Sequence, residues 1–317
     1  MKSSQILAAS QLSSVSPSEF LQRAGEIVLG KSHQVQLALC TILAQGHLLI
    51  EDVPGVGKTT LVKFLAKALG LQPTRIQFTN DLLPADILGT TVYDSEAHKF
   101  RFHRGPIFGQ LVIADELNRA TPKTQSACLQ AMEERKVSID GVTYDLPKPF
   151  MVIATQNPRE QAGTYPLPES QLDRFLMRIS LGYPNREAER ELLRGTLRQQ
   201  LIDELDPLWT PEEVLAMQQA CASVHVSAAI VDYVQQILEY SRTQSGGSFG
   251  LSPRAGLALM AAAKSWAFLE GRNMVVPDDV QAVGVSVMAH RLNQIDEHDS
   301  FREQERAKEI LQAVRVD

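Results

Sequence analysis

Cysteine is scarce in this sequence. Three cysteines, Cys40, Cys128 and Cys221, stand far apart among 317 residues, and each falls in an apolar stretch of helical character. No CxxC pair or His-rich neighbourhood surrounds them, so the spacing that a zinc module requires is missing. We interpret the three as small buried apolar residues in a reducing compartment, rather than as disulfide partners or nucleophiles.

Long hydrophobic runs are missing as well. The most apolar segment, residues 255–269, is broken by Lys264 and is short for a membrane span. The opening MKSSQILAASQLSSV carries one lysine, and polar residues interrupt its short apolar patch, so it makes a poor signal peptide. We therefore expect a cytoplasmic protein without a membrane span, whose Ser-rich residues 1–16 form a disordered or frayed tail.

An excess of positive charge is also absent. The chain has 31 Lys and Arg against 37 Asp and Glu, which gives a net charge of −6. Proteins that bind the phosphates of nucleic acids usually present a broad basic surface, so we do not expect nucleic acid as the partner. The sequence does contain enough hydrophobic residues, 44% of the total, to form the core of one large domain or of two ordinary ones.

Strand and helix patterns alternate up to about residue 183. The apolar strand candidates are residues 47–51, 75–79, 111–115, 150–155 and 177–181. Helical patterns separate them, so we predict an α/β fold with a mainly parallel sheet covered by helices on both faces. Beyond Pro184 the strand patterns end, and helix starts at 210–211, 252–253 and 276–277 indicate helices only. The predicted division is an α/β domain over residues 17–184 and a smaller all-α domain over residues 185–317.

A glycine-rich segment joins the first strand to a helix. Backbone N–H groups in such a turn, together with those at the helix N-terminus, converge on an anion and can cradle a triphosphate. Lys58 is expected to reach the β and γ phosphates, and Thr59 to offer its hydroxyl to Mg²⁺. The strict motif begins with Gly where this chain has Asp52, whose side chain we expect to bond nearby backbone. The expected nucleotide-binding residues here are Pro54, Gly55, Val56, Gly57, Lys58, Thr59 and Thr60.

Two acidic residues, Asp115 and Glu116, follow the strand at 111–114, where open α/β sheets place their ligands. Asp115 is expected to hold magnesium, often through water, and Glu116 to orient and deprotonate an attacking water. Without the glycine-rich segment, both would read equally well as solvated residues at a strand end. Asn157, after another strand, could hydrogen-bond the γ-phosphate or the water, although Asn-Pro also favours a simple turn.

Two arginines are further candidates. Arg174 precedes the last strand and could project from the subunit edge toward a neighbour's γ-phosphate; the alternative is a salt bridge with Asp173 or Glu169. Arg254 lies in the first turn of the helix that begins at residues 252–253, where a cation opposes the helix dipole. Such a local inconsistency favours a functional role, and a solvated helix-end charge is the alternative.

Taken together, these residues resemble the AAA+ superfamily and, within it, the MoxR family of bacterial ATPases, near the RavA-type ATPases. The most specific stretches are residues 51–59, 114–120, 154–158 and 167–175. The resemblance implies a P-loop domain followed by a helical lid, with Lys58 and Thr59 in Walker A and Asp115 and Glu116 in Walker B. It also makes Asn157 sensor 1, Arg174 an arginine finger acting in trans, and Arg254 sensor 2. The adenine pocket would be lined by Val28, Leu29 and Gly30.

Two insertions fit the same family. Residues 83–106 resemble the insert within helix 2. Val137, Ile139, Val142 and Tyr144 are spaced to lie on one side of a two-residue hairpin, which matches the hairpin before sensor 1. Family members use such loops to face a central pore or a client, and packing on its own domain is the alternative.

Family likeness implies a ring, expected to be a hexamer, in which turnover of ATP to ADP with Mg²⁺ drives remodelling or maturation of a client protein. A von Willebrand A domain protein is the candidate client, and it would have to come from another chain. The rival readings are a DNA-dependent motor related to replicative helicases, which share both insertions, and a nucleotide-gated scaffold. A small-molecule kinase is the weakest reading, because it needs no neighbouring arginine.

Overall fold

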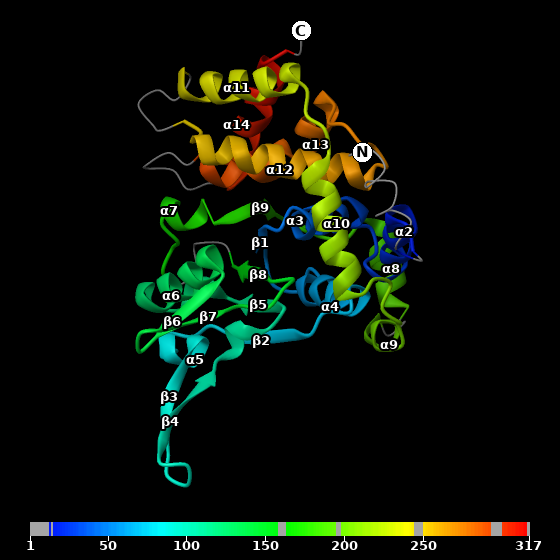
Figure 1. The fold of residues 1–317 in the computed structure, drawn as a ribbon. Coiled ribbons are helices and arrows are strands. Elements are labelled where there is room, and N and C mark those ends of the chain that lie inside the picture. Colours follow the sequence, from blue (N-terminus) through cyan, green and yellow to red (C-terminus); the bar gives the residue numbers. More distant parts are fainter. Residues whose placement is uncertain are drawn as a thin grey trace. The chain divides into compact units, whose positions relative to one another are not determined.

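The computed structural model describes residues 13, 15–157, 163–194, 198–243, 250–292 and 300–315 (Figure 1). Nearly all of the predicted tail over residues 1–16 lies outside these residues. The chain divides into two compact units. We call Leu49–Arg174 with Ser180–Pro211 the sheet unit, and Met1–Leu48, Phe175–Ile179 and Glu212–Asp317 the helical unit. The units interleave along the chain, whereas the sequence-based division at residue 184 is a single cut; that division stays a prediction.

A five-stranded sheet has the order β2-β5-β8-β1-β9. The strands are β1 (His47–Glu51), β2 (Pro73–Gln77), β5 (Leu111–Asp115), β8 (Met151–Gln156) and β9 (Phe175–Ile179). β5 pairs in parallel with β2 on one side and with β8 on the other, so its carboxyl end lies between theirs. Every residue of β1, β8 and β9 is buried, as expected of parallel strands covered on both faces. The predicted parallel sheet is confirmed.

Two strands lie two residues earlier in the sequence than expected, β2 at 73–77 instead of 75–79 and β9 at 175–179 instead of 177–181. β2 ends at Gln77 rather than at 79, although the Phe78 N–H still donates to the Asp115 carbonyl at 2.9 Å. β9 ends at Ile179 rather than at 181. The reason at β9 is that the backbone N–H groups of Leu181 and Gly182 donate to the carboxylate of Asp52, at 2.6 Å each.

The helices of the sheet unit are α4 (Lys58–Ala68), α5 (Pro84–Leu88), α6 (Pro122–Glu134), α7 (Glu169–Leu172), α8 (Arg186–Leu193) and α9 (Arg198–Asp203). An apolar stripe of α4 is fully buried and gives this helix its inner face: Leu61, Phe64, Leu65 and Ala68. Gly70 follows α4 at φ 59°, and α6 begins at Pro122 after Thr121, an arrangement of glycine after a helix and proline at its first position that is common at helix ends. Short 3-10 turns occur at η1 (Pro106–Phe108) and η2 (Leu117–Arg119).

Two antiparallel hairpins belong to the sheet unit, β3 (Gly89–Asp94) with β4 (Lys99–Arg104) and β6 (Lys136–Ile139) with β7 (Val142–Asp145). Figure 1 shows the first of them extending beyond α5. In the second, Val137 pairs with Tyr144 and Ile139 with Val142, so the four predicted side chains do share one face. The turn residues between these strands have φ of 50° and 78°, which suits the Asp-Gly pair at 140–141.

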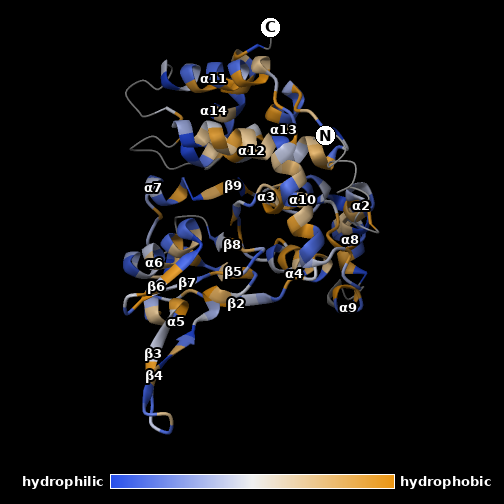
Figure 2. Cartoon of the chain, in the orientation of Figure 1, coloured by the Kyte–Doolittle hydropathy of each residue, from blue (hydrophilic) through white to orange (hydrophobic). Residues whose placement is uncertain are grey.

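The helical unit contains α2 (Pro17–Ile27), α3 (Ser32–Leu43), most of α10 (Pro211–Ser223), α11 (Ala228–Thr243), α12 (Pro253–Leu269), α13 (Pro277–Met288), η3 (Ala289–Arg291) and α14 (Ser300–Ala313). The predicted helix starts with proline at the first position are found in α10, α12 and α13. Helices in Figure 2 carry both colours, as amphipathic helices with one buried face do. None of the described helices has the length and apolar character that a membrane crossing requires.

The three cysteines are buried with free thiols, as predicted. Burial raises the pKa of Cys128 and of Cys221 to about 12. At neutral pH these thiols stay protonated and lack the thiolate form that nucleophiles and metal ligands need.

Candidate active site

The loop from Asp52 to Gly57 connects β1 to the N-terminus of α4. Gly55 and Gly57 have φ of 86° and 96°, a region that residues with a Cβ adopt at a cost. A Cβ at either glycine would meet no atom within 4 Å, so the backbone conformation, and not crowding, requires glycine there. The first N–H groups of α4 have no partner within the helix, and they face outward along its axis beside this loop. The loop and the helix end therefore form an anion-binding arrangement.

Asp52, which replaces the first glycine of the strict motif, is almost fully buried. Its Oδ1 accepts from the N–H of the next residue, Val53, at 2.9 Å, which is the expected bond to nearby backbone. Its Oδ2 accepts from the Ser180 hydroxyl at 3.0 Å and from the N–H groups of Leu181 and Gly182. Four donors thus compensate one buried carboxylate, and they tie the start of the loop to the segment after β9.

Lys58 is the first residue of α4. Its Nζ donates to the carbonyls of Asp52 at 2.6 Å and Val53 at 3.3 Å, and to Asn157 Oδ1 at 3.4 Å. Partial burial lowers the pKa of this ammonium, and the charges of Asp52, Asp115 and Glu116 oppose that change. These acids stabilise the protonated form beside the loop.

Asp115 ends β5, and each of its carboxylate oxygens has a partner. Oδ1 accepts from the Thr155 hydroxyl at 2.9 Å. Oδ2 accepts from Arg75, with Nε at 2.7 Å and Nη2 at 2.6 Å. Neither partner was predicted, because Thr155 lies on β8 and Arg75 on β2, the two strands that flank β5.

Glu116 follows with φ of 56°, a left-handed conformation that costs a non-glycine residue energy and is often found at functional sites. Its backbone N–H donates to Thr155 Oγ1 at 3.0 Å. Side-chain Oε1 accepts from Asn157 Nδ2 at 3.2 Å, and Oε2 accepts from Gln77 at 3.2 Å and pairs with Arg119 at 2.8 Å. The Asn157 amide therefore contacts both Glu116 and Lys58. These contacts join three predicted residues in one cluster.

The oxygen donors predicted for magnesium are Thr59 and Asp115. Thr59 is exposed in the first turn of α4, and the Asp115 side chain is 16% exposed. A hydroxyl and a carboxylate are hard donors of the type Mg²⁺ takes, and Mg²⁺ usually keeps several waters and completes its shell with phosphate oxygens. Asp115 Oδ2 already forms an ion pair with Arg75, so the environment of this carboxylate accommodates a cation. The residues fit magnesium.

Arg174 forms an ion pair with Glu133 of α6, with 3.0 Å between Nε and Oε2. The sequence-based alternative named Asp173 or Glu169 as the partner, and missed Glu133 because α6 lies about forty residues earlier in the chain. The pair holds Arg174 against α6. Its predicted action on a neighbouring subunit stays a prediction.

Four predicted residues belong to the helical unit. Arg254 is exposed in the first turn of α12, whose cap residue Ser252 accepts from the Ala255 N–H at 3.2 Å. Val28, Leu29 and Gly30 follow α2, and Gly30 has φ of 66°. Their roles at the nucleotide stay predictions.

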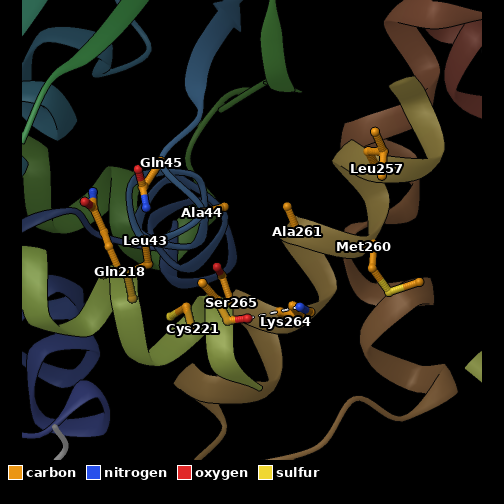
Figure 3. A pocket seen from close by; sticks show the side chains of 11 residues that line it. Leu43, Ala44, Gln45, Gln218, Cys221, Leu257, Met260, Ala261, Lys264 and Ser265 are labelled. Atoms are coloured by element: carbon orange, nitrogen blue, oxygen red, sulfur yellow. Dashed lines mark hydrogen bonds between the residues drawn. The ribbon is translucent and has the colours of Figure 1, made fainter. Parts of the chain in front are cut away.

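A cavity of about 260 Å³ also lies in the helical unit, lined by the end of α3 and by α10 and α12 (Figure 3). Its lining is mainly apolar, and Lys264 Nζ donates to the Ala222 carbonyl at 3.1 Å. None of the predicted site residues lines it. The cavity is distinct from the cluster around Lys58 and Glu116.

Comparison with known proteins agrees with the geometry of that cluster. Residues 47–177 match the family described as ATPase family associated with various cellular activities (AAA). Residues 239–314 match the AAA lid domain. The first match contains the glycine-rich loop, both acids and Asn157.

Several relatives are similar over most of their length. The uncharacterized protein YeaC of Bacillus subtilis is 42% identical over 298 residues, which cover 93% of both chains. Chaperone MoxR1 of Mycobacterium tuberculosis is 43% identical over 84% of this chain and 72% of its own. Protein MoxR of Paracoccus denitrificans is 33% identical over 84% of this chain and 85% of its own.

Among solved structures, a crystal structure of an ATPase candidate from Cytophaga hutchinsonii superposes with a TM-score of 0.86. It is 34% identical in sequence, and the match covers 99% of this chain and 98% of that one. Fold and sequence similarity thus extend over both the sheet unit and the helical unit.

Proposed function

The chain belongs to the MoxR family of AAA+ ATPases, and on that premise we propose that it hydrolyses ATP with magnesium at the cluster around Lys58 and Glu116. The contacts of Asn157 support this most directly. Its Oδ1 accepts from the Lys58 ammonium at 3.4 Å, and its Nδ2 donates to Glu116 Oε1 at 3.2 Å. The Asn157 side-chain amide thus links Lys58, a cation that can bind phosphate, to Glu116, a carboxylate that can accept a proton from water.

In this mechanism the loop amides and Lys58 bind the β and γ phosphates of ATP. Glu116 orients the attacking water and takes its proton, while Asn157 holds the carboxylate and the ammonium at a fixed separation. Thr59 and Asp115 would hold Mg²⁺, which would neutralise charge on the phosphate oxygens. The products are ADP and phosphate, and the proton leaves from Glu116.

The proposal extends to assembly. The chain forms a ring, a hexamer by family likeness, in which turnover drives chaperone-like remodelling or maturation of a client protein. The relative from Mycobacterium tuberculosis carries the name chaperone, which supports this role. A von Willebrand A domain protein is the proposed client, and Arg174 of one subunit acts on the ATP of the next.

Two substitutions test the ATPase proposal. Lys58→Ala should remove ATP binding, because the phosphates lose their ammonium partner. Lys63→Ala, which changes an exposed lysine on the same helix, is the matched control and should bind normally. Glu116→Gln should bind ATP but turn over about 100- to 10,000-fold more slowly, because an amide takes no proton from water. Calorimetry and phosphate release measure both effects.

Normal ATP affinity in Lys58→Ala would refute the phosphate role of this lysine. Surviving turnover in Glu116→Gln would place the base at another residue. The Glu116→Gln form, which should retain ATP, is also the form in which a client is most readily captured.

A further inference from the structure

Thr155 is a buried residue near the end of β8, with 3% of its surface exposed. Ala114 of β5 pairs with Ala154 of β8, so the next residues along the two parallel strands are Asp115 and Thr155. The Thr155 hydroxyl contacts both acidic residues of the site: the Asp115 carboxylate at 2.9 Å and the Glu116 backbone N–H at 3.0 Å. One side chain therefore connects the two acids.

The direction of these bonds follows from the groups involved. An ionised carboxylate only accepts hydrogen bonds, and a backbone N–H only donates. The single hydroxyl proton of Thr155 must therefore point to Asp115 Oδ1, and an oxygen lone pair must receive the Glu116 N–H. The Thr155 hydroxyl therefore uses only Oδ1 of the Asp115 carboxylate. The other oxygen, Oδ2, is contacted by Arg75.

We propose that Thr155 is a positioning residue for magnesium and for the attacking water, an inference that rests on the proposed ATPase function. Its hydroxyl fixes the rotation of the Asp115 carboxylate, the group that would hold the metal. The same hydroxyl holds the Glu116 backbone in its left-handed conformation, from which the Glu116 side chain reaches Asn157. Partners in the shell around a metal ligand typically set affinity or activity by 10- to 100-fold.

Thr155→Val tests this role, because valine keeps the shape of threonine and removes the hydroxyl. Calorimetry in EDTA should give ATP affinity close to wild type, since Lys58 and the loop amides are unchanged. The gain in ATP affinity on adding magnesium and the turnover number should each fall by about 10- to 100-fold.

Thr41→Val is the matched control. Thr41 is fully buried in α3, and its hydroxyl donates to the Leu37 carbonyl at 2.8 Å, within the helical unit. This variant loses a buried hydroxyl of the same kind without touching either acid. Its magnesium dependence and its turnover should match wild type.

A second pair of variants guards against misfolding of Thr155→Val. Thr155→Ser keeps the hydroxyl and should retain most of the wild-type turnover, whereas Thr155→Ala should show the loss of about 10- to 100-fold. Wild-type magnesium dependence in Thr155→Val or Thr155→Ala, or an equal loss in Thr155→Ser, would overturn the inference while leaving the ATPase proposal intact. Absence of ATP binding by the wild-type chain would overturn both.

Discussion

At the scale of single residues, His290 is a buried base that the fold keeps neutral. Its Nε2 lies 3.1 Å from the Phe175 carbonyl of β9, and the ion pair of Arg178 with Glu303 lies in the same unit. Burial lowers the pKa of His290 well below 6.5, and the charges of Arg291 and Arg178 lower it further. The unfolded chain therefore binds a proton below pH 6.5 that the folded chain does not bind there.

We expect this histidine to make the helical unit less stable in mild acid. Stability is retained above the unfolded pKa of 6.5 and falls as the pH drops below it, by up to about 1.4 kcal/mol per pH unit for one proton. Urea unfolding at several pH values measures the slope. His290→Gln should reduce the slope between pH 6.5 and 5, and His103→Gln, at an exposed position, should leave it unchanged. Equal slopes for wild type and His290→Gln would contradict this.

At the scale of elements, the two hairpins of the sheet unit are connected by aromatic contacts. Phe102 of β4 stacks on Tyr144 of β7, with 4.3 Å between ring centroids and 23° between planes. Phe102 also meets Phe108 edge-on at 5.8 Å, and Arg104 lies over the Phe108 ring at 5.2 Å. The hairpin at 136–145 thus packs in part on its own unit, while Val142 remains 50% exposed.

A double-mutant cycle should detect this contact. Phe102→Ala and Tyr144→Ala, alone and combined, are expected to show a coupling of about 0.5–1.5 kcal/mol in the free energy of unfolding, the usual value for an aromatic pair. Tyr93, which meets Phe100 edge-on at 5.3 Å within the first hairpin, forms the control pair with Tyr144 of the second hairpin. Strict additivity of the Phe102 and Tyr144 effects would show that the hairpins are energetically independent.

At the scale of the whole molecule, Arg174 provides the test of assembly. Arg174→Ala should leave ATP binding intact and lower turnover about a thousandfold or more, as expected of an arginine finger. Mixing this variant with Lys58→Ala should restore part of the turnover, because an interface at which the Lys58→Ala subunit offers its arginine to the Arg174→Ala subunit has both an intact site and an intact arginine. Phosphate release from mixed and unmixed samples measures the rescue.

The ion pair with Glu133 supplies the control for that experiment. Glu133→Gln breaks the pair but leaves the arginine in place, so it should keep its turnover. Should Glu133→Gln lose as much turnover as Arg174→Ala, the arginine would be acting through the pair with α6 and not on a neighbouring subunit.

Much of the fold could be predicted from local signals. Proline after a capping position marked the starts of α2, α6, α12 and α13, because the first turn of a helix needs no N–H from its first residue. The closely spaced glycines at 55 and 57 marked the loop before α4, and both have positive φ in the structure. The acids at 115 and 116 were predictable because strand ends in parallel sheets meet at one edge. Each of these signals lies within a few neighbouring residues.

The chain by itself therefore determined the glycine-rich loop, the lysine that follows it and the acid that ends β5. Only the tertiary structure decided how those groups are held. Thr155 and Arg75 each lie 40 residues from Asp115, and the segment at 180–182 lies about 130 residues from Asp52. Such partners depend on the strand order β2-β5-β8-β1-β9, which arises from burial of both sheet faces and leaves no mark in the local sequence.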